Sequence, residues 1–168
     1  MTSNGDATFR CVETQLEIAI DAPRENVWQA LTANISDWWP AHFYVGQEPR
    51  GIVLEDCVGG RIYEDWGDGG GSLWATVLVF DRGSTLEWAG DMSPDFAGPA
   101  RSMTRFKLRE EDGSTVVEFR DSAYGRLADM AVEGMPHGWS LLLDGCLKPY
   151  LEEGKHPDRP TSVVAASN

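Results

Sequence analysis

The sequence predicts one α+β domain in which a seven-stranded antiparallel sheet lies against a long C-terminal helix. Three observations predict this fold class. An alternating strand pattern opens the chain, six strand-like runs follow two short helical segments, and an amphipathic helical pattern lies near the C-terminus. The 168 residues suit a single domain, and a hydrophobic content of 42% is enough for a substantial core.

The first strand and two short helices are expected between residues 11 and 40. Apolar and polar side chains alternate from Cys11 to Asp21, as in a half-buried strand. Asp21 and Pro23 then favour the start of a helix that runs to about Leu31. A second short helical turn covers residues 35–39, because Pro40 cannot continue it.

The middle of the chain reads as an antiparallel meander. Glycine- and aspartate-rich turn clusters separate short runs that are rich in β-branched and aromatic residues. Consecutive runs joined by such turns pair as antiparallel neighbours. The six runs are Ile52–Cys57, Arg61–Trp66, Leu73–Phe80, Thr85–Trp88, Ser102–Leu108 and Thr115–Asp121, and with the first strand they make seven strands.

The main helix is expected from about Pro136 to Glu152, where apolar residues recur at three- and four-residue steps. Pro136 suits a first helical turn, whereas Pro149 should kink or loosen the last one. The polar segment after Gly154 has no period. We therefore expect the domain to span residues 9–153, with flexible termini at 1–8 and 154–168.

The composition excludes several classes of protein. With 27 Asp and Glu against 14 Lys and Arg, the net charge of −13 has the wrong sign for nucleic-acid binding. No apolar run is long enough for a membrane span, and no secretory signal opens the chain, so a cytoplasmic location is expected. The widely spaced Cys11, Cys57 and Cys146 are expected to be reduced, buried thiols, and no metal or cofactor motif occurs.

Several motifs resemble those of the SRPBCC or START-like superfamily. They are the segment from Ile20 to Thr32, Trp38-Trp39-Pro40, Gly59-Gly60-Arg61, Leu86-Glu87-Trp88 and Gly138-Trp139. The similarity covers about residues 14–153 and is strongest to homologues of the activator of the ninety-kilodalton heat-shock protein's ATPase. It implies a helix-grip fold, also called START-like or birch-pollen-allergen-like, in the order β-α-α-β6-α. It further implies a hydrophobic cavity between sheet and helix, and no universal catalytic residue.

Large apolar side chains are the candidates for lining that cavity, because an aromatic ring offers much apolar surface and a thioether adapts to irregular shapes. Trp28 and Trp88 lie within the fold motifs and are assigned to core packing. For the other tryptophans and the methionines, cavity lining and core filling both stay open. The ligand-binding candidates are Trp39, Tyr63, Trp66, Trp74, Phe106, Met130, Met135, Trp139, Leu142, Leu143 and Cys146.

Four ionisable residues are weak catalytic candidates. His137 precedes Gly138-Trp139 at the expected cavity mouth and could exchange a proton near neutral pH. Glu64 and Asp65 are adjacent on one strand, so they should point to opposite faces. A carboxylate that points inward would need a basic partner. Arg101 is the fourth catalytic candidate for this reason, and Arg61, Arg105 and Arg120 are alternative partners.

The leading functional hypothesis is binding of a hydrophobic small molecule, such as a lipid, an aromatic metabolite or a polyketide-like compound. The resemblance also implies two alternatives. One is a cyclase or hydratase that works in the same cavity, and the other is a co-chaperone whose acidic surface meets a basic protein client. An antiparallel edge strand would allow a homodimer.

Overall fold

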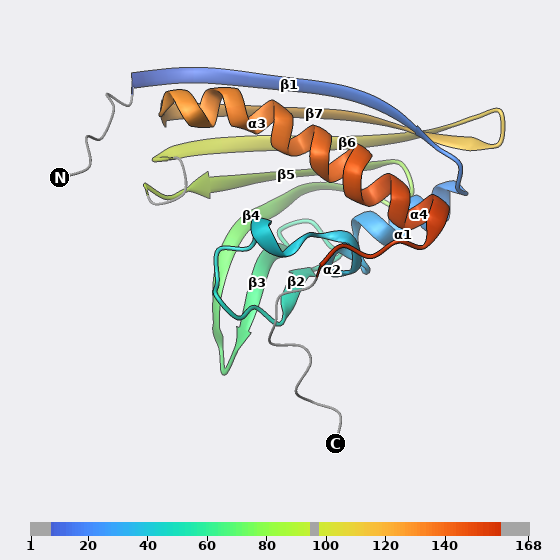
Figure 1. The fold of residues 1–168 in the computed structure, drawn as a ribbon, viewed down its shortest axis with the longest axis horizontal. Coiled ribbons are helices and arrows are strands. Elements are labelled where there is room, and N and C mark those ends of the chain that lie inside the picture. Colours follow the sequence, from blue (N-terminus) through green and yellow to red (C-terminus); the bar gives the residue numbers. More distant parts are fainter. Residues whose placement is uncertain (1–7, 95–97, 159–168) are drawn as a thin grey trace.

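The computed structural model describes residues 8–94 and 98–158, and its sheet has the predicted class (Figure 1). Seven antiparallel strands pair in the order β1-β7-β6-β5-β4-β3-β2. From β2 to β7, strands that are consecutive in the sequence pair with each other. The first strand, β1, pairs with β7 and forms one edge of the sheet. The strands are β1 Thr8–Ile20, β2 Gly51–Leu54, β3 Arg61–Gly67, β4 Gly70–Asp81, β5 Thr85–Met92, β6 Ala100–Glu111 and β7 Ser114–Leu127.

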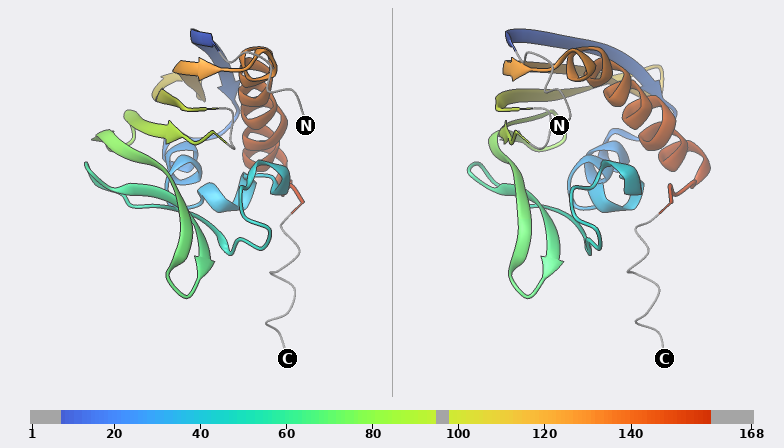
Figure 2. Two further views of the ribbon diagram at one scale, coloured as in Figure 1. Left: turned by 90° about the vertical axis from the view of Figure 1, so that its left-hand side faces the viewer. Right: turned by 60° about the vertical axis from the view of Figure 1, so that its left-hand side comes forward.

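The helices lie on the concave side of this curved sheet (Figures 1 and 2). The two short helices between β1 and β2 are present as predicted, and a 3₁₀ turn follows them. The long C-terminal helix crosses the sheet beside β1 and ends near α1. The helical segments are α1 Arg24–Leu31, α2 Ile35–Trp38, η1 Ala41–Phe43, α3 Asp129–Leu142, η2 Leu143–Leu147 and α4 Lys148–Glu153.

The C-terminal helix starts earlier than predicted, because α3 begins at Asp129 and Pro136 lies inside it. The predicted loosening of the helix at Pro149 takes the form of one wider helical turn. A proline has no N–H to donate to the carbonyl four residues back, and its ring would clash with that carbonyl. The chain accommodates this with the wider π-helical turn η2, in which the Lys148 N–H bonds the Leu143 carbonyl, so Pro149 falls in the first turn of α4.

The strand β2 is shorter than predicted and ends at Leu54. The Glu55 carboxylate turns back to accept hydrogen bonds from the Arg61 backbone N–H, at 2.8 Å, and from the Arg61 guanidinium. These bonds lower the pKa of Glu55 to about 2. In the Gly59-Gly60-Arg61 motif the two glycines therefore close the loop between β2 and β3, and Arg61 begins β3.

Buried apolar residues form two clusters under the C-terminal helix. The larger one contains Trp28, Trp38, Phe106 and Phe119, and α1, α2 and the second half of the helix pack on it. The smaller one comprises Val12, Ala100, Ala123 and Leu127, with Met92 and Met135 packed against it. The core is thus divided along β7, between Phe119 and Ala123.

Three further predictions concern the cysteines, the chain termini and membrane-spanning helices. Cys11 and Cys57 are exposed, so the prediction of three buried thiols is wrong, although all three cysteines are free. Thr8 already belongs to β1, whereas residues 1–7 and 159–168 of the predicted flexible termini lie outside the described residues. In the described part of the chain, no helix is long and apolar enough to cross a membrane.

Candidate functional site

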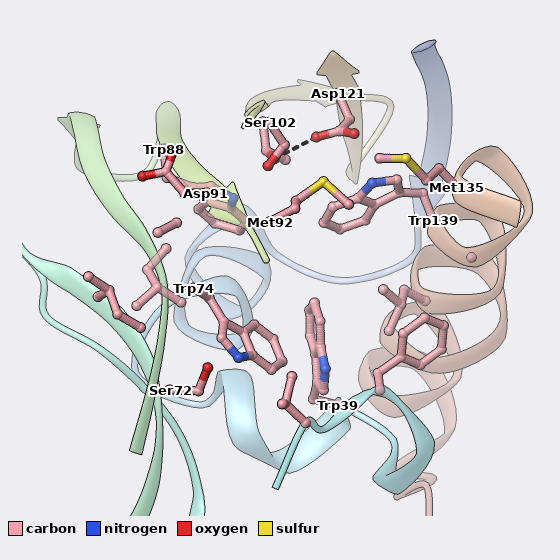
Figure 3. A pocket seen from close by; sticks show the side chains of 18 of the residues that line it. Trp39, Ser72, Trp74, Trp88, Asp91, Met92, Ser102, Asp121, Met135 and Trp139 are labelled. Carbon is pink, nitrogen blue, oxygen red and sulfur yellow. Dashed lines mark hydrogen bonds between the residues drawn. The ribbon is translucent and has the colours of Figure 1, made fainter. Parts of the chain in front are cut away.

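A cavity of about 400 Å³ lies between α3 and the concave face of the sheet (Figure 3). Its lining comes from α2, the segment after it, strands β3 to β7, and one stripe of α3. Apolar side chains dominate the walls, and four indole rings are among them. The indole rings and thioethers of the lining belong to Trp39, Trp74, Trp88, Trp139, Met92 and Met135.

The tryptophans reach the cavity from separate elements. Trp39 follows α2, and its ring centroid lies 5.4 Å from that of Trp74 on β4 and 6.3 Å from that of Trp139 on α3. A glycine on β5 allows Trp74 to take this place. A Cβ on Gly90 would lie 1.9 Å from the Trp74 carbonyl oxygen, so only glycine permits the two backbones to approach this closely.

The cavity is bordered by side chains of both apolar clusters. Trp39, Trp88 and Trp139 on its walls belong to or pack on the larger cluster, whereas Met92 and Met135 pack on the smaller one. A fully packed domain of this size would bring the two clusters into contact. The volume greatly exceeds the roughly 30 Å³ share of one water molecule, so this is a ligand-sized space and not a packing defect.

The cavity wall between the clusters carries a buried carboxylate, that of Asp121 on β7. Asp121 is only 2% exposed and belongs to the inward-facing row that includes Phe119 and Ala123. The Thr104 hydroxyl on β6 donates a hydrogen bond to its Oδ1 at 2.7 Å, and the Trp139 side chain also hydrogen-bonds the carboxylate. Burial raises the pKa of Asp121, and these two hydrogen bonds oppose the rise.

Asp121 belongs to a row of polar side chains across an otherwise apolar sheet face. Thr14 on β1 and Thr104 on β6 are its direct neighbours in the antiparallel register. Both threonines are buried, and Thr14 Oγ1 has no hydrogen-bond partner among the described residues. The indole N–H groups of Trp39 and Trp74 also lack an acceptor in the described structure. Such unpaired groups are rare in protein interiors. Trp39 and Trp74 line the cavity, whereas Thr14 and the equally unpaired indole N–H of Trp28 do not.

A second buried carboxylate, that of Glu64 on β3, has different surroundings. Glu64 is fully buried and accepts hydrogen bonds from the backbone N–H groups of Val45 and Gly46, at 2.5 and 2.9 Å. The Trp66 indole N–H donates a third bond at 2.8 Å. Glu64 is not part of the cavity lining. It fastens the segment before β2 to the sheet, which is a structural task.

The structure separates the predicted cavity residues into two groups. Trp39, Trp74, Met135, Trp139 and Leu142 line the cavity, and so does Trp88, which we had assigned to the core alone. The other six ligand-binding candidates do not line the cavity.

Three of these side chains are turned away from the cavity. The Trp66 ring is 42% exposed and is held by its bond to Glu64, and Tyr63 packs under the Arg61 guanidinium at 4.8 Å. Met130 is 82% exposed, because it lies on the solvent side of the first turn of α3.

The remaining three fill the core without bordering the cavity. Phe106 and Leu143 are buried in the larger cluster. The Phe106 ring packs against the ring of Trp139. Cys146 packs against the same cluster, where burial raises the pKa of its thiol. This thiol therefore has the character of a small apolar side chain.

The four catalytic candidates do not converge on the cavity. His137 is exposed on α3, and Arg101 pairs with Asp91 on the neighbouring strand at 3.0 Å. Glu64 and Asp65 do point to opposite faces, as predicted, and Asp65 accepts a bond from the Gly67 N–H at 2.8 Å. The prediction that an inward carboxylate needs an arginine partner is wrong for Glu64, because neutral N–H donors stabilise it.

Sequence reasoning missed Asp121, although its position left a signal. The segment from Val117 to Ala123 alternates, with Val117, Phe119 and Ala123 on one face of the strand. Asp121 occupies an inward position in this pattern, which is unusual for a charged residue and identifies it as a candidate. Among the residues described, no group of His, Cys, Asp and Glu side chains could hold a metal ion.

Comparisons with known proteins agree with this architecture. The family model described as Activator of Hsp90 ATPase homolog 1-like protein matches residues 21–152. No curated protein matches the sequence. Among solved structures, the chain is similar to the solution structure of the Aha1 dimer from Colwellia psychrerythraea, with 25% identity and a TM-score of 0.60 over 86% of this chain and 98% of that one.

Two further structures show how widely this fold is shared. DynU16, a protein of the dynemicin biosynthetic locus, has 21% identity and a TM-score of 0.64 over 88% of this chain and 50% of its own. Ara h 8.0201 has 13% identity and a TM-score of 0.60 over 84% of this chain and 98% of its own. Because the family model covers most of the chain and the fold agrees, the protein belongs to the Activator of Hsp90 ATPase homolog 1-like family of the SRPBCC superfamily.

Proposed function

We propose that the protein binds a hydrophobic small molecule in the cavity between α3 and the sheet. The observation that supports this most directly is the cavity itself. Its volume of about 400 Å³ lies within the range of small-molecule sites, and indole rings and thioethers form its walls. A few polar groups on an apolar wall are typical of sites that orient a ligand while burying most of its surface.

The stripe of α3 that faces the cavity offers a way to test this proposal. Gly134 lies in that stripe, and a Cβ placed on it would meet no atom within 4 Å. A side chain can therefore begin at this position without a clash at its Cβ, and a phenylalanine should obstruct the cavity while it removes the entropic cost of a helical glycine. Gly134→Ala is the matched control, because it restores the same backbone preference without obstructing the cavity.

The test is a fluorescence titration with N-phenyl-1-naphthylamine, a neutral apolar probe. Wild type and Gly134→Ala should bind it saturably with one site, and Gly134→Phe should bind at least roughly tenfold more weakly with unchanged thermal stability or better. Native mass spectrometry of the purified protein should show a bound apolar compound that Gly134→Phe lacks. Absence of saturable binding to wild type, or equal affinity of both variants, would contradict the proposal.

The other functions predicted from the sequence have less support. The cyclase or hydratase hypothesis named His137, Glu64, Asp65 and Arg101, and none of them lines the cavity. The co-chaperone hypothesis has the family name in its favour, but it involves no feature of the cavity. The Colwellia relative is described as a dimer, so a homodimer of this chain stays a prediction, as does a cytoplasmic location.

A further inference from the structure

We propose that the cavity selects ligands that carry a positively charged amine on an apolar body, with Asp121 as the group that binds the amine. The inference rests on the proposed ligand-binding function and adds the chemical class of the ligand. Its basis is a buried carboxylate on the wall of an aromatic cavity that faces no cation of its own chain.

The first step of the argument concerns unused hydrogen-bonding capacity. An ionised carboxylate has about four lone-pair sites. Asp121 receives bonds from the Thr104 hydroxyl and the Trp139 side chain, which leaves further sites for a donor that enters the cavity. Glu64, by contrast, already receives three N–H bonds and is shielded from the cavity.

The second step concerns charge. The neighbours that face Asp121 from β1, β6 and α3 are Thr14, Thr104 and Trp139, and none of them is ionisable. No Arg, Lys or His of the described chain forms an ion pair with Asp121. Arg105 and Arg120 lie on alternate positions of β6 and β7 and therefore on the opposite face of the sheet. A buried carboxylate is costly without a cation, so a ligand ammonium group would supply the missing partner.

The third step concerns the surroundings of the carboxylate. Indole rings attract cations through their π faces, and Trp39, Trp74, Trp88 and Trp139 all line this cavity. Asp91 is the other titratable side chain of the lining, but Arg101 pairs with it at 3.0 Å, which leaves Asp121 as the lining carboxylate without a cation from the described residues. The chain as a whole carries a net charge of −13, which attracts cations and repels anions. A fatty acid or another anionic ligand would therefore meet repulsion at Asp121, whereas an amine would meet attraction.

Three probes with one ring system and different polar groups test the inference: 1-naphthylmethylamine, 1-naphthylmethanol and 1-naphthoate. Calorimetric titration at about neutral pH should give wild-type affinities in the order amine, alcohol, carboxylate, with the amine at least roughly tenfold tighter than the alcohol. Asp121→Asn should weaken amine binding about tenfold or more and leave alcohol binding within about twofold. Asp144→Asn, which removes the same charge from an exposed position outside the cavity, should keep the preference.

The pH dependence separates ligand binding by Asp121 from a purely structural role. Since the amine stays protonated in acid and only ionised Asp121 attracts it, amine affinity should rise with pH through the Asp121 pKa, whereas alcohol affinity stays constant. Equal wild-type affinity for amine and alcohol, or a preference that survives in Asp121→Asn, would overturn the inference while the binding function stands. Failure of all three probes to bind would overturn the proposed function itself.

Discussion

The two halves of the sheet each contain one buried carboxylate, and their surroundings differ. Glu64, on β3, lies away from the cavity and receives three N–H bonds, two from the backbone segment that it fastens. Asp121, on β7, lies on the cavity wall, receives bonds from two side chains, and has a raised pKa. Burial alone therefore does not distinguish the two carboxylates. They differ in the number of N–H donors that they receive and in whether they border the cavity, and our proposal for Asp121 rests on that difference.

The largest effect is expected for Glu64→Gln. The amide keeps one acceptor oxygen but places an NH₂ group against N–H donors, so at least one buried donor loses its partner. We expect the free energy of unfolding at neutral pH to fall by about 2 to 4 kcal/mol, measured by urea denaturation.

Asp65→Asn is the matched control for this variant, because it changes the adjacent carboxylate on the opposite face. Asp65 accepts a hydrogen bond from the Gly67 N–H, and an asparagine can still accept it. We expect a loss within about 0.5 kcal/mol. Equal losses for the two variants would show that Glu64 is not the structural fastening described above.

A smaller effect is expected for Thr104→Val, which keeps the side-chain shape and removes the hydroxyl donor to Asp121. The free energy of unfolding should fall by about 1 kcal/mol, the typical contribution of one hydrogen bond. Because that bond opposes the effect of burial, its loss should raise the pKa of Asp121 further.

Thr115→Val provides the comparison for the threonine change. Thr115 is also fully buried and donates one bond of 2.7 Å, to the Ala22 carbonyl, away from Asp121. Thr115→Val should lose about as much stability as Thr104→Val. The pKa of Asp121, measured by NMR, should not change in Thr115→Val. If both variants shift that pKa equally, the Thr104 bond does not control Asp121.

The smallest net effect on stability at neutral pH is expected for Asp121→Asn. The variant weakens the hydrogen bonds from Thr104 and Trp139, but it also removes a buried charge, and the two contributions oppose each other. It should therefore unfold at nearly the wild-type denaturant concentration or above it. A loss as large as that of Glu64→Gln would contradict the distinction between the two carboxylates.

The same variant should also change how stability depends on pH. The pKa of Asp121 is raised on folding, so between its ordinary value and the raised one the folded state binds more protons than the unfolded state. The contribution of Asp121 to stability is then highest in acid and falls as the pH rises through that window. The stability of wild type relative to Asp121→Asn, measured by thermal unfolding from acid to neutral pH, should show this decline, because groups such as Glu55 contribute equally to both proteins.

Much of the fold could be predicted from the sequence because local signals and topology agree. The alternating strands, the turn glycines and the entry motif around Pro23 determine seven antiparallel strands with two short helices. The start of the last helix was missed because Pro136 was assigned to a first turn, whereas the helix extends back to Asp129 through a proline in its interior. The π-helical turn before Pro149 depends on packing that no local pattern reveals.

The candidate site was less predictable, since it depends on which apolar side chains border an empty space. Trp66 and Trp74 both lie in predicted strands, yet Trp66 bonds Glu64 and does not line the cavity, whereas Trp74 does. That difference follows from side-chain contacts across strands. Asp121, by contrast, was predictable in principle, because it interrupts the apolar face of an alternating strand.

The most direct test of this account is the pKa of Asp121, followed through its side-chain ¹³C carboxyl resonance with and without 1-naphthylmethylamine. The account predicts that the pKa of the free protein lies above the ordinary value of an aspartate, because burial outweighs two hydrogen bonds. Saturation with the amine should lower this pKa, since a bound cation favours the ionised carboxylate. A pKa at or below the ordinary value in the free protein, or no change on amine binding, would contradict it.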